Sequence, residues 1–134
     1  MKLVLDTNAY SGLMRGQADI VCHVRSADQI YLPAPVVGEL LFGFRGGNRV
    51  QQNKQQLQQF VNAPSVMFVP TDKEVCDRYA LVLHQLKSKG NPIPTNDVWI
   101  AAHTSALGAD LLSSDHPFAA IDGQLGSAPC RERV

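Results

Sequence analysis

Four acidic residues occupy positions that suggest a shared chemical site. Asp6 directly follows the apolar segment "LVL", and Asp115 follows "LLSS" in the same way. Glu39 borders the apolar positions of "PAPVVGELLFGF", and Asp97 stands in "TNDVWIAA". A carboxylate at the edge of a hydrophobic core loses hydration unless a partner compensates for it. Each of these acids therefore either has a local structural role or binds something.

If the four acids converge, their mutual repulsion must be compensated. Two carboxylates about 4 Å apart repel by on the order of 4 kcal/mol at an intermediate effective dielectric, so the cluster must hold protons or cations. Oxygen ligands alone select hard cations, which favours Mg²⁺ or Mn²⁺. Such an ion polarises a phosphoryl oxygen and lowers the pKa of a bound water. The predicted chemistry is phosphodiester hydrolysis.

The segments around these acids predict alternating strands and helices. The short apolar runs "KLVL" and "DLLS" are typical of strands buried on both faces, and "QIYL" and "SVMFV" are further strand candidates. Helices are predicted in "DIVCHVRS", "PAPVVGELLFGF" and "QQNKQQLQQF", and from Thr95 or Asn96 to Gly108. This alternation predicts a three-layer α/β/α domain with a mostly parallel central sheet. Ligands of such sheets bind beyond the carboxyl ends of the strands.

The clearest amphipathic helix is predicted to begin after Thr71. Thr71 and Glu74 have the spacing of a capping box, and Gly90 is a suitable stop. Apolar residues follow the capping box at helical spacing: Val75, Tyr79, Val82, Leu83 and Leu86.

Length and composition are those of one ordinary domain. The chain has 134 residues, of which 45% are hydrophobic, so a single domain over 1–134 is expected, with 123–134 as a C-terminal tail. No apolar run approaches the roughly 20 residues of a membrane span, so we expect no membrane segment or signal peptide. The three cysteines are widely spaced and form no CxxC pair, which argues against a disulfide framework or a zinc site. A reducing cytoplasmic location fits this pattern.

The quoted motifs resemble those of a known family. "LVLDTNAY", "PVVGELLFGF", "PIPTNDVWIAA" and "LLSSDHPF" are similar to the four acidic motifs of PIN-domain ribonucleases, in the order found in VapC toxins of prokaryotic toxin-antitoxin modules. The resemblance runs from residue 1 to about residue 122, and the tail "GQLGSAPCRERV" is less apolar than the family's usual final strand. It implies that the metal-binding acids are Asp6, Glu39, Asp97 and Asp115. It also implies neighbouring polar positions at Thr7, Asn8 and Ser113, a homodimer, and a small cognate VapB-like antitoxin.

Each acid also has a purely structural alternative. Asp6 could cap a helix, Asp97 could simply be favoured by a helix dipole, and Asp115 could form a turn. Glu39 would face solvent if its helix were shifted in register. The three neighbouring polar residues could hydrogen-bond the local backbone.

The charge balance is compatible with an RNA substrate. The chain has 12 basic and 12 acidic residues, and setting aside the four proposed ligands leaves eight acids against twelve bases. This excess of four positive charges would favour phosphate binding, which supplies most sequence-independent affinity for nucleic acids. Possible RNA contacts are Arg15, Arg45 and Arg49.

Apolar residues are abundant in two of the predicted helices. We expect part of this surface to face a partner or a second subunit, because a monomer core would not absorb all of it. The residues are Leu41, Phe42, Phe44, Leu57 and Phe60.

Three classes of function follow from these observations. The favoured one is a Mg²⁺- or Mn²⁺-dependent endoribonuclease that acts as a toxin. A phosphatase with Asp6 as nucleophile is an alternative, but Asn8 stands where such an enzyme would need a general acid. A noncatalytic RNA-binding regulatory domain is the other alternative, although four carboxylates would repel RNA in the absence of a metal.

Overall fold

The computed structural model describes residues 1–113; residues 114–134, and with them Asp115, the predicted short turn "PFAAI" and the tail, lie outside the described part. Ten elements follow one another along the described chain. They are β1 (Lys2–Leu5), α1 (Thr7–Met14), α2 (Ala18–Ser26), β2 (Gln29–Pro33), α3 (Ala34–Arg45), α4 (Val50–Val61), β3 (Val66–Val69), α5 (Lys73–Ser88), α6 (Thr95–Leu107) and β4 (Asp110–Leu112).

The four described strands form one parallel sheet in the order β3-β2-β1-β4. Leu3 in β1 is paired with Ile30 on one side and with Asp110 on the other, and Ile30 is paired in turn with Val66. Val4 and Leu5 are completely buried, as expected for a central strand that is covered on both faces. Because all four strands run the same way, their carboxyl ends lie at one edge of the sheet.

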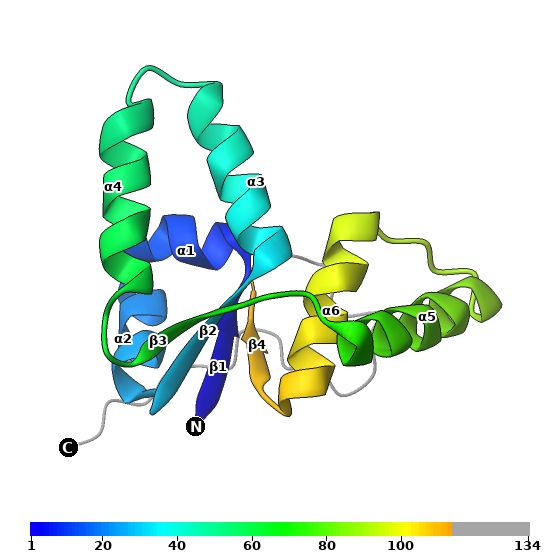
Figure 1. Ribbon diagram of the computed structural model, residues 1–134. Coiled ribbons are helices and arrows are strands. Elements are labelled where there is room, and N and C mark those ends of the chain that lie inside the picture. The colour runs from blue at the N-terminus through cyan, green and yellow to red at the C-terminus, as the bar shows by residue number, and fades with distance from the viewer. Residues whose placement is uncertain (114–134) are drawn as a thin grey trace.

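Helices flank this sheet, as Figure 1 shows. Helices α3 and α4 form a hairpin that extends beyond the sheet at the upper left of the picture, and α1 and α2 lie beside the sheet on the same side. Helices α5 and α6 pack against each other on the right. One continuous core joins these layers and includes Leu5, Leu32, Val36, Val98 and Leu111. The predicted three-layer α/β/α architecture with a parallel sheet is confirmed.

Helix α1 was not predicted from the sequence. Asp6 is its N-cap and accepts a hydrogen bond from the backbone N–H of Ala9 at 2.7 Å. The buried ring of Tyr10, a residue of α1, contacts the ring of Phe60 in α4 edge to face, with ring centroids 5.5 Å apart. The helix is only eight residues long, and its apolar face is too short to give a clear period.

The start of α5 corrects the predicted capping box. The N-cap is Asp72, whose carboxylate accepts a hydrogen bond from the N–H of Val75 at 3.1 Å. The hydroxyl of Thr71 instead lies 2.8 Å from Nε2 of His103 in α6. The predicted cap was wrong by one residue because Thr71 has a distant partner and Asp72 supplies an equally suitable acceptor. Gly90 follows the helix with φ of +70°, as its predicted role as the stop requires.

Helices α5 and α6 form a closely packed pair. Val75, Val82 and Leu86 of α5 are buried, and the ring of Tyr79 stacks on that of Trp99 at a centroid distance of 3.8 Å. This contact fixes α6, whose first turn carries Asp97.

The expected surplus of apolar surface is found on α3 but not on α4. Phe42 is 81% exposed and Leu41 is 37% exposed. Leu57 is buried, and Phe44 and Phe60 pack against the core. Sequence periodicity alone could not separate these cases, because α4 uses its apolar residues to cover α1 and the sheet.

The state of the cysteines differs in part from the expectation drawn from the sequence. Cys76 is free and exposed, whereas Cys22 is disulfide-bonded, a pairing that the wide spacing of the cysteines did not predict. Spacing along the chain does not limit distance in the fold.

No helix within residues 1–113 is long and apolar enough to cross a membrane.

The buried imidazole of His103 should make stability depend on pH. Desolvation lowers the pKa of His103 from the ordinary value of about 6.5, and the carboxylate of Asp72 opposes this shift. The unfolded chain therefore binds a proton more readily than the folded one, so this contribution to stability is present above about pH 6.5 and is lost as the pH falls. We expect the melting temperature to decrease as the pH is lowered below about 6.5.

The variant His103→Gln should show a weaker dependence of the melting temperature on pH. The matched control is His84→Gln, which changes an exposed histidine of α5 and should retain the dependence of the wild type. Equal pH dependence in His103→Gln and wild type would show that another group is responsible.

Candidate active site

Among the predicted acids within residues 1–113, Asp6 is the most deeply buried. It lies at the carboxyl end of β1 and is only 1% exposed. Its Oδ1 accepts the hydrogen bond from Ala9, and its Oδ2 accepts one from the hydroxyl of Ser113. A carboxylate oxygen can accept more than one hydrogen bond or ligand. The side chain is therefore held in one orientation.

Ser113 reaches Asp6 because β1 and β4 are neighbours in the sheet. It directly follows β4 and is 5% exposed. The backbone N–H of Asp6 also approaches the carbonyl of Leu112, at 3.4 Å. Two strand ends far apart in the sequence are thus joined at the edge where parallel sheets bind ligands.

The residues that follow Asp6 differ in their surroundings. The hydroxyl of Thr7 is buried and has no hydrogen-bond partner within residues 1–113, whereas the side chain of Asn8 is exposed. A buried polar group without a partner costs about 1–3 kcal/mol. A bound water or substrate oxygen beside Asp6 would remove this cost.

Glu39 is linked to the start of α6. It is half-buried on α3, and its Oε1 accepts a hydrogen bond from the side-chain amide of Asn96. Sequence reasoning considered Asn96 only as a helix start and missed this contact. The one available signal was its position directly before Asp97.

Asp97 is the third residue of α6 and is half-buried. The N-cap of this helix is Pro94, which provides no side-chain hydrogen bond, and the N–H of Asp97 donates to the carbonyl of Pro94 at 3.0 Å. The positive end of the helix dipole favours a carboxylate here. The same dipole would also attract a phosphate.

The predicted acids of residues 1–113 belong to two pairs of neighbouring elements. Asp6 belongs to the β1 and β4 edge, while Glu39 and Asp97 lie where α3 contacts α6. Within residues 1–113, however, no three histidine, cysteine, aspartate or glutamate residues form a group able to hold a metal ion. The fourth predicted acid, Asp115, lies outside the described residues.

The donor chemistry of the site fits a hydrated hard cation. Its predicted ligands are carboxylates, and the orphaned hydroxyl of Thr7 lies next to Asp6 in the chain. Mg²⁺ and Mn²⁺ prefer oxygen ligands and commonly retain several waters, so they do not require a complete protein cage.

The possible RNA contacts are separated by the fold. Arg15 and Arg49 line one groove between α1 and α4. Arg45 is the last residue of α3 and is not part of the groove lining.

Comparison with known proteins identifies the class to which this fold and site belong. The PIN domain family matches residues 3–124, and the chain belongs to this family. It is similar to Ribonuclease VapC1 of Haemophilus influenzae strain R2866, with 27% identity over 117 residues that cover 84% of this chain and 86% of the relative.

Solved structures support the same assignment. The VapBC-1 structure from nontypeable Haemophilus influenzae has a TM-score of 0.82 and 26% identity, and the match covers 94% of this chain and 96% of that one. VapBC2 from Rickettsia felis, bound to a DNA fragment from its promoter, shares the fold with a TM-score of 0.81 and 22% identity, over 94% and 97% of the two chains.

The hydrogen bond from Ser113 to Asp6 should contribute measurably to stability. In Ser113→Ala, the buried carboxylate loses a donor that water cannot easily replace, so the free energy of unfolding should fall by about 1–3 kcal/mol. Urea denaturation followed by circular dichroism measures this change. The control Ser65→Ala removes an exposed hydroxyl and should change stability by less than about 0.5 kcal/mol. Equal stability of Ser113→Ala and wild type would contradict the importance of this contact.

Proposed function

We propose that the protein is a metal-dependent endoribonuclease that hydrolyses RNA phosphodiester bonds as the toxin of a toxin-antitoxin module. The observation that carries this proposal is the buried carboxylate of Asp6, held at the carboxyl edge of the sheet by Ala9 and Ser113. The PIN domain assignment and the relative named Ribonuclease VapC1 support the same activity. Neither comparison favours the phosphatase or the noncatalytic RNA-binding alternative.

The ligands of Mg²⁺ or Mn²⁺ in this proposal are Asp6, Glu39, Asp97 and Asp115. When bound, the ion supplies Lewis-acid stabilisation of the phosphoryl oxygens and lowers the pKa of the attacking water.

The other residues of the site orient these ligands. Asn96 donates a hydrogen bond to one oxygen of Glu39, while Ala9 and Ser113 each donate one to a different oxygen of Asp6. Thr7 has a buried hydroxyl that can donate a hydrogen bond to a water or to a phosphate oxygen. Asn8 is exposed beside it and can contact the substrate.

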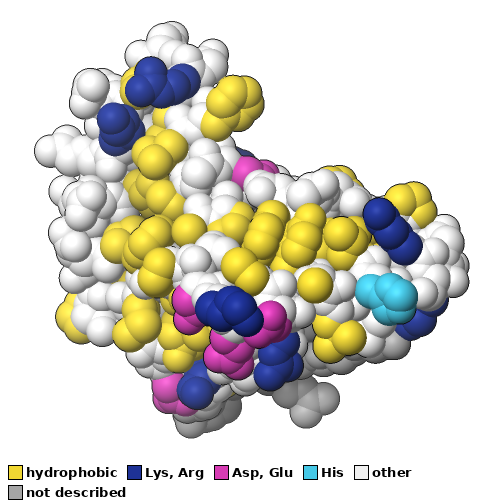
Figure 2. Space-filling view, turned by 45° about the vertical axis from the view of Figure 1, so that its right-hand side comes forward, with side chains coloured by type: hydrophobic (Ala, Val, Ile, Leu, Met, Phe, Trp, Pro, Cys, Tyr) yellow, Lys and Arg dark blue, Asp and Glu magenta, His cyan; other side chains and the backbone are white. Residues whose placement is uncertain are grey.

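The exposed apolar residues support a partner protein. Figure 2 shows hydrophobic side chains in a band across one face of the molecule. The large exposed hydrophobic residues of the described part include Leu41, Phe42, Met67, Phe68 and Leu81. Contiguous apolar surface of this kind is typical of protein interfaces. We infer that a small VapB-like antitoxin and a second copy of the chain cover parts of it.

The antitoxin would inhibit most directly by neutralising the acidic site. An arginine side chain can bind carboxylates through two parallel hydrogen bonds and carries a permanent charge. It would thereby compete with the metal for Asp6 and its neighbours. In this proposal the whole chain is a single nuclease domain that acts on RNA in the cytoplasm.

The first test of the mechanism is the variant Asp97→Asn. Cleavage of RNA should fall by at least about a hundredfold if the metal stabilises the transition state by several kcal/mol. The melting temperature without metal should stay near that of the wild type or rise, because repulsion between carboxylates decreases. Asp19→Asn is the matched control, since Asp19 is an exposed acid in the first turn of α2. A folded and fully active Asp97→Asn would remove Asp97 from the site.

Metal removal gives a second test of the same activity. EDTA should abolish cleavage by the wild type, and added Mg²⁺ or Mn²⁺ should restore it, because oxygen ligands bind these ions reversibly. Cleavage by highly purified protein in EDTA would refute the metal-dependent mechanism.

The partner is tested by coexpression with the small open reading frame next to this gene. A small protein should copurify and suppress cleavage, and an Arg→Ala scan of its C-terminal half should find one arginine needed for inhibition. If no small protein copurifies and the chain expressed alone does not slow growth, the toxin role is wrong and the nuclease activity stands alone.

A further inference from the structure

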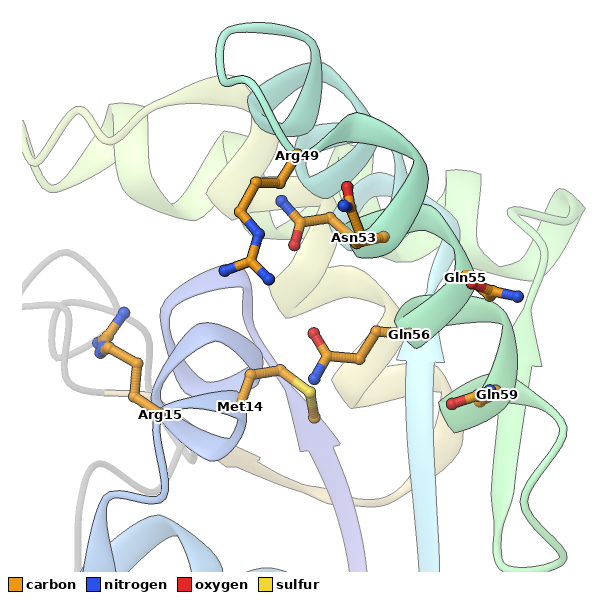
Figure 3. Close-up of a pocket in the computed structure, with 8 residues that line it drawn as sticks. Met14, Arg15, Arg49, Asn53, Gln55, Gln56 and Gln59 are labelled. Atoms are coloured by element: carbon orange, nitrogen blue, oxygen red, sulfur yellow. The ribbon is translucent and has the colours of Figure 1, made fainter.

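A polar groove lies between helices α1 and α4, and its lining includes the C-cap of α1, Arg15. Its volume is about 560 Å³. Figure 3 shows Arg15 at the end of α1, Arg49 at the start of α4, and the side-chain amides of Asn53 and Gln56 on α4. The polar residues that matter for the argument are Arg15, Arg49, Gln52, Asn53, Gln56 and Gln59.

The composition of this groove is unusual for a solvated helix face. None of the lining residues within the described part of the chain is acidic, although the chain as a whole has equal numbers of acidic and basic residues. Helix α4 itself contains no aspartate or glutamate, and neither does α1. The two arginines therefore create a local positive potential that no carboxylate of the lining cancels.

The donors of the groove are available for a ligand. Within residues 1–113, the structure shows no hydrogen bond or salt bridge made by the side chains of Arg15, Arg49, Gln52, Asn53 or Gln56. The amides follow Arg49 at spacings of three, four and seven residues, so they share one face of α4. This face is directed across the groove at Met14 and Arg15.

We propose that this groove binds a single-stranded segment of the RNA substrate next to the bond that is cleaved. The inference rests on the proposed ribonuclease function and names the part of the surface that holds the substrate. Helix α1 connects the two sites, because its N-cap is Asp6 and its C-cap is Arg15. Eight helical residues span about 12 Å, a distance that a few nucleotides bridge.

The two kinds of side chain have different roles in this proposal. Arg15 and Arg49 bind phosphates through charge-assisted, two-point hydrogen bonds. Gln52, Asn53 and Gln56 offer both donors and acceptors to the exposed base edges of unpaired nucleotides, which is how proteins commonly read single-stranded RNA. The arginines thus supply affinity, and the amides supply preference for particular bases.

The same groove is poorly suited to an antitoxin helix. An amphipathic helix binds by placing apolar side chains in an apolar groove, and among the described residues of this lining only Met14 is apolar. The large exposed hydrophobic residues of the described chain lie elsewhere, at Met1 and on α3, β3 and α5. Charge and polarity therefore favour RNA over a protein partner.

The arginines are tested by RNA binding in an Asp97→Asn background, so that the probe is not cleaved. The probe is a fluorescein-labelled single-stranded RNA of random sequence, and its affinity is measured by anisotropy over a range of salt concentrations. Arg15→Gln combined with Arg49→Gln should weaken binding at least about tenfold and reduce the slope of log affinity against log salt by about 1.4, the value for two lost phosphate contacts.

A matched control removes two positive charges at the other edge of the sheet. Lys2 begins β1, and Arg25 lies in the last turn of α2; both are exposed. Lys2→Gln with Arg25→Gln should retain wild-type affinity within about twofold and the same salt slope. An equal loss in both double variants would show a general charge effect and overturn the proposal.

The amides are tested by Gln52→Ala combined with Gln56→Ala. This variant should change which bases are enriched near the cleavage site in sequenced RNA products, while the salt slope of binding stays unchanged because no charge is lost. Unchanged base preference together with unchanged affinity would contradict a role for the amides.

Failure of this inference can be distinguished from failure of the proposed function. A dinucleotide substrate is too short to span both sites, so its cleavage by the wild type and by Asp97→Asn tests the nuclease mechanism without the groove. If Asp97→Asn cleaves normally, the nuclease mechanism is wrong. If the arginine variants bind RNA normally but no longer bind the antitoxin, the groove is a protein-binding site and the RNA proposal is wrong.

Discussion

The burial of one carboxylate at the junction of β1, α1 and β4 is the constraint around which the rest of the site is built. Asp6 is almost inaccessible to solvent, and a charge in such a place must be compensated. The fold provides a backbone N–H from Ala9 and a hydroxyl from Ser113. These contacts start a helix, join two strand ends and orient the carboxylate at the edge of the sheet. One side chain therefore has a structural role and, in the proposed mechanism, a chemical role as well.

The parallel sheet gives the proposed site its location. All described strands end at the same edge, and α1 and α3 begin directly after the ends of β1 and β2. The hydrogen bond between Asn96 and Glu39 then locks α3 against the first turn of α6. The stacked rings of Tyr79 and Trp99 fix α6 from its other side. Rigid support of this kind matters because metal-assisted hydrolysis depends on accurately placed ligands.

Different parts of the surface suit a protein partner and an RNA ligand. Exposed apolar residues such as Phe42 and Phe68 suit a protein partner, whereas the groove that contains Arg15 and Arg49 has almost no apolar lining. Binding an antitoxin and binding RNA therefore need not use the same contacts. The antitoxin and the metal ion would compete chiefly at the acidic site, because an arginine of the antitoxin and the metal ion would bind the same carboxylates.

The sequence by itself determined the strands and most of the helices, and it is the basis on which four acidic positions are proposed as the site. These features depend on local rules, since the apolar period of α5 and the glycine after it act within a few residues. The same local rules misplaced the N-cap of α5 by one residue, because the hydroxyl of Thr71 forms a hydrogen bond with His103 in another helix. They also gave no sign of α1, whose apolar face is short.

Only the tertiary structure decided which side chains meet. Ser113 and Asp6 are 107 residues apart, and Asn96 and Glu39 are 57 residues apart. The groove likewise joins Arg15 to the amides of α4, two segments that no motif connects. Contacts of this kind follow from strand order and helix packing, which are set by the whole core and not by the residues that touch. The sequence could therefore name the chemistry of the site, whereas its geometry required the fold.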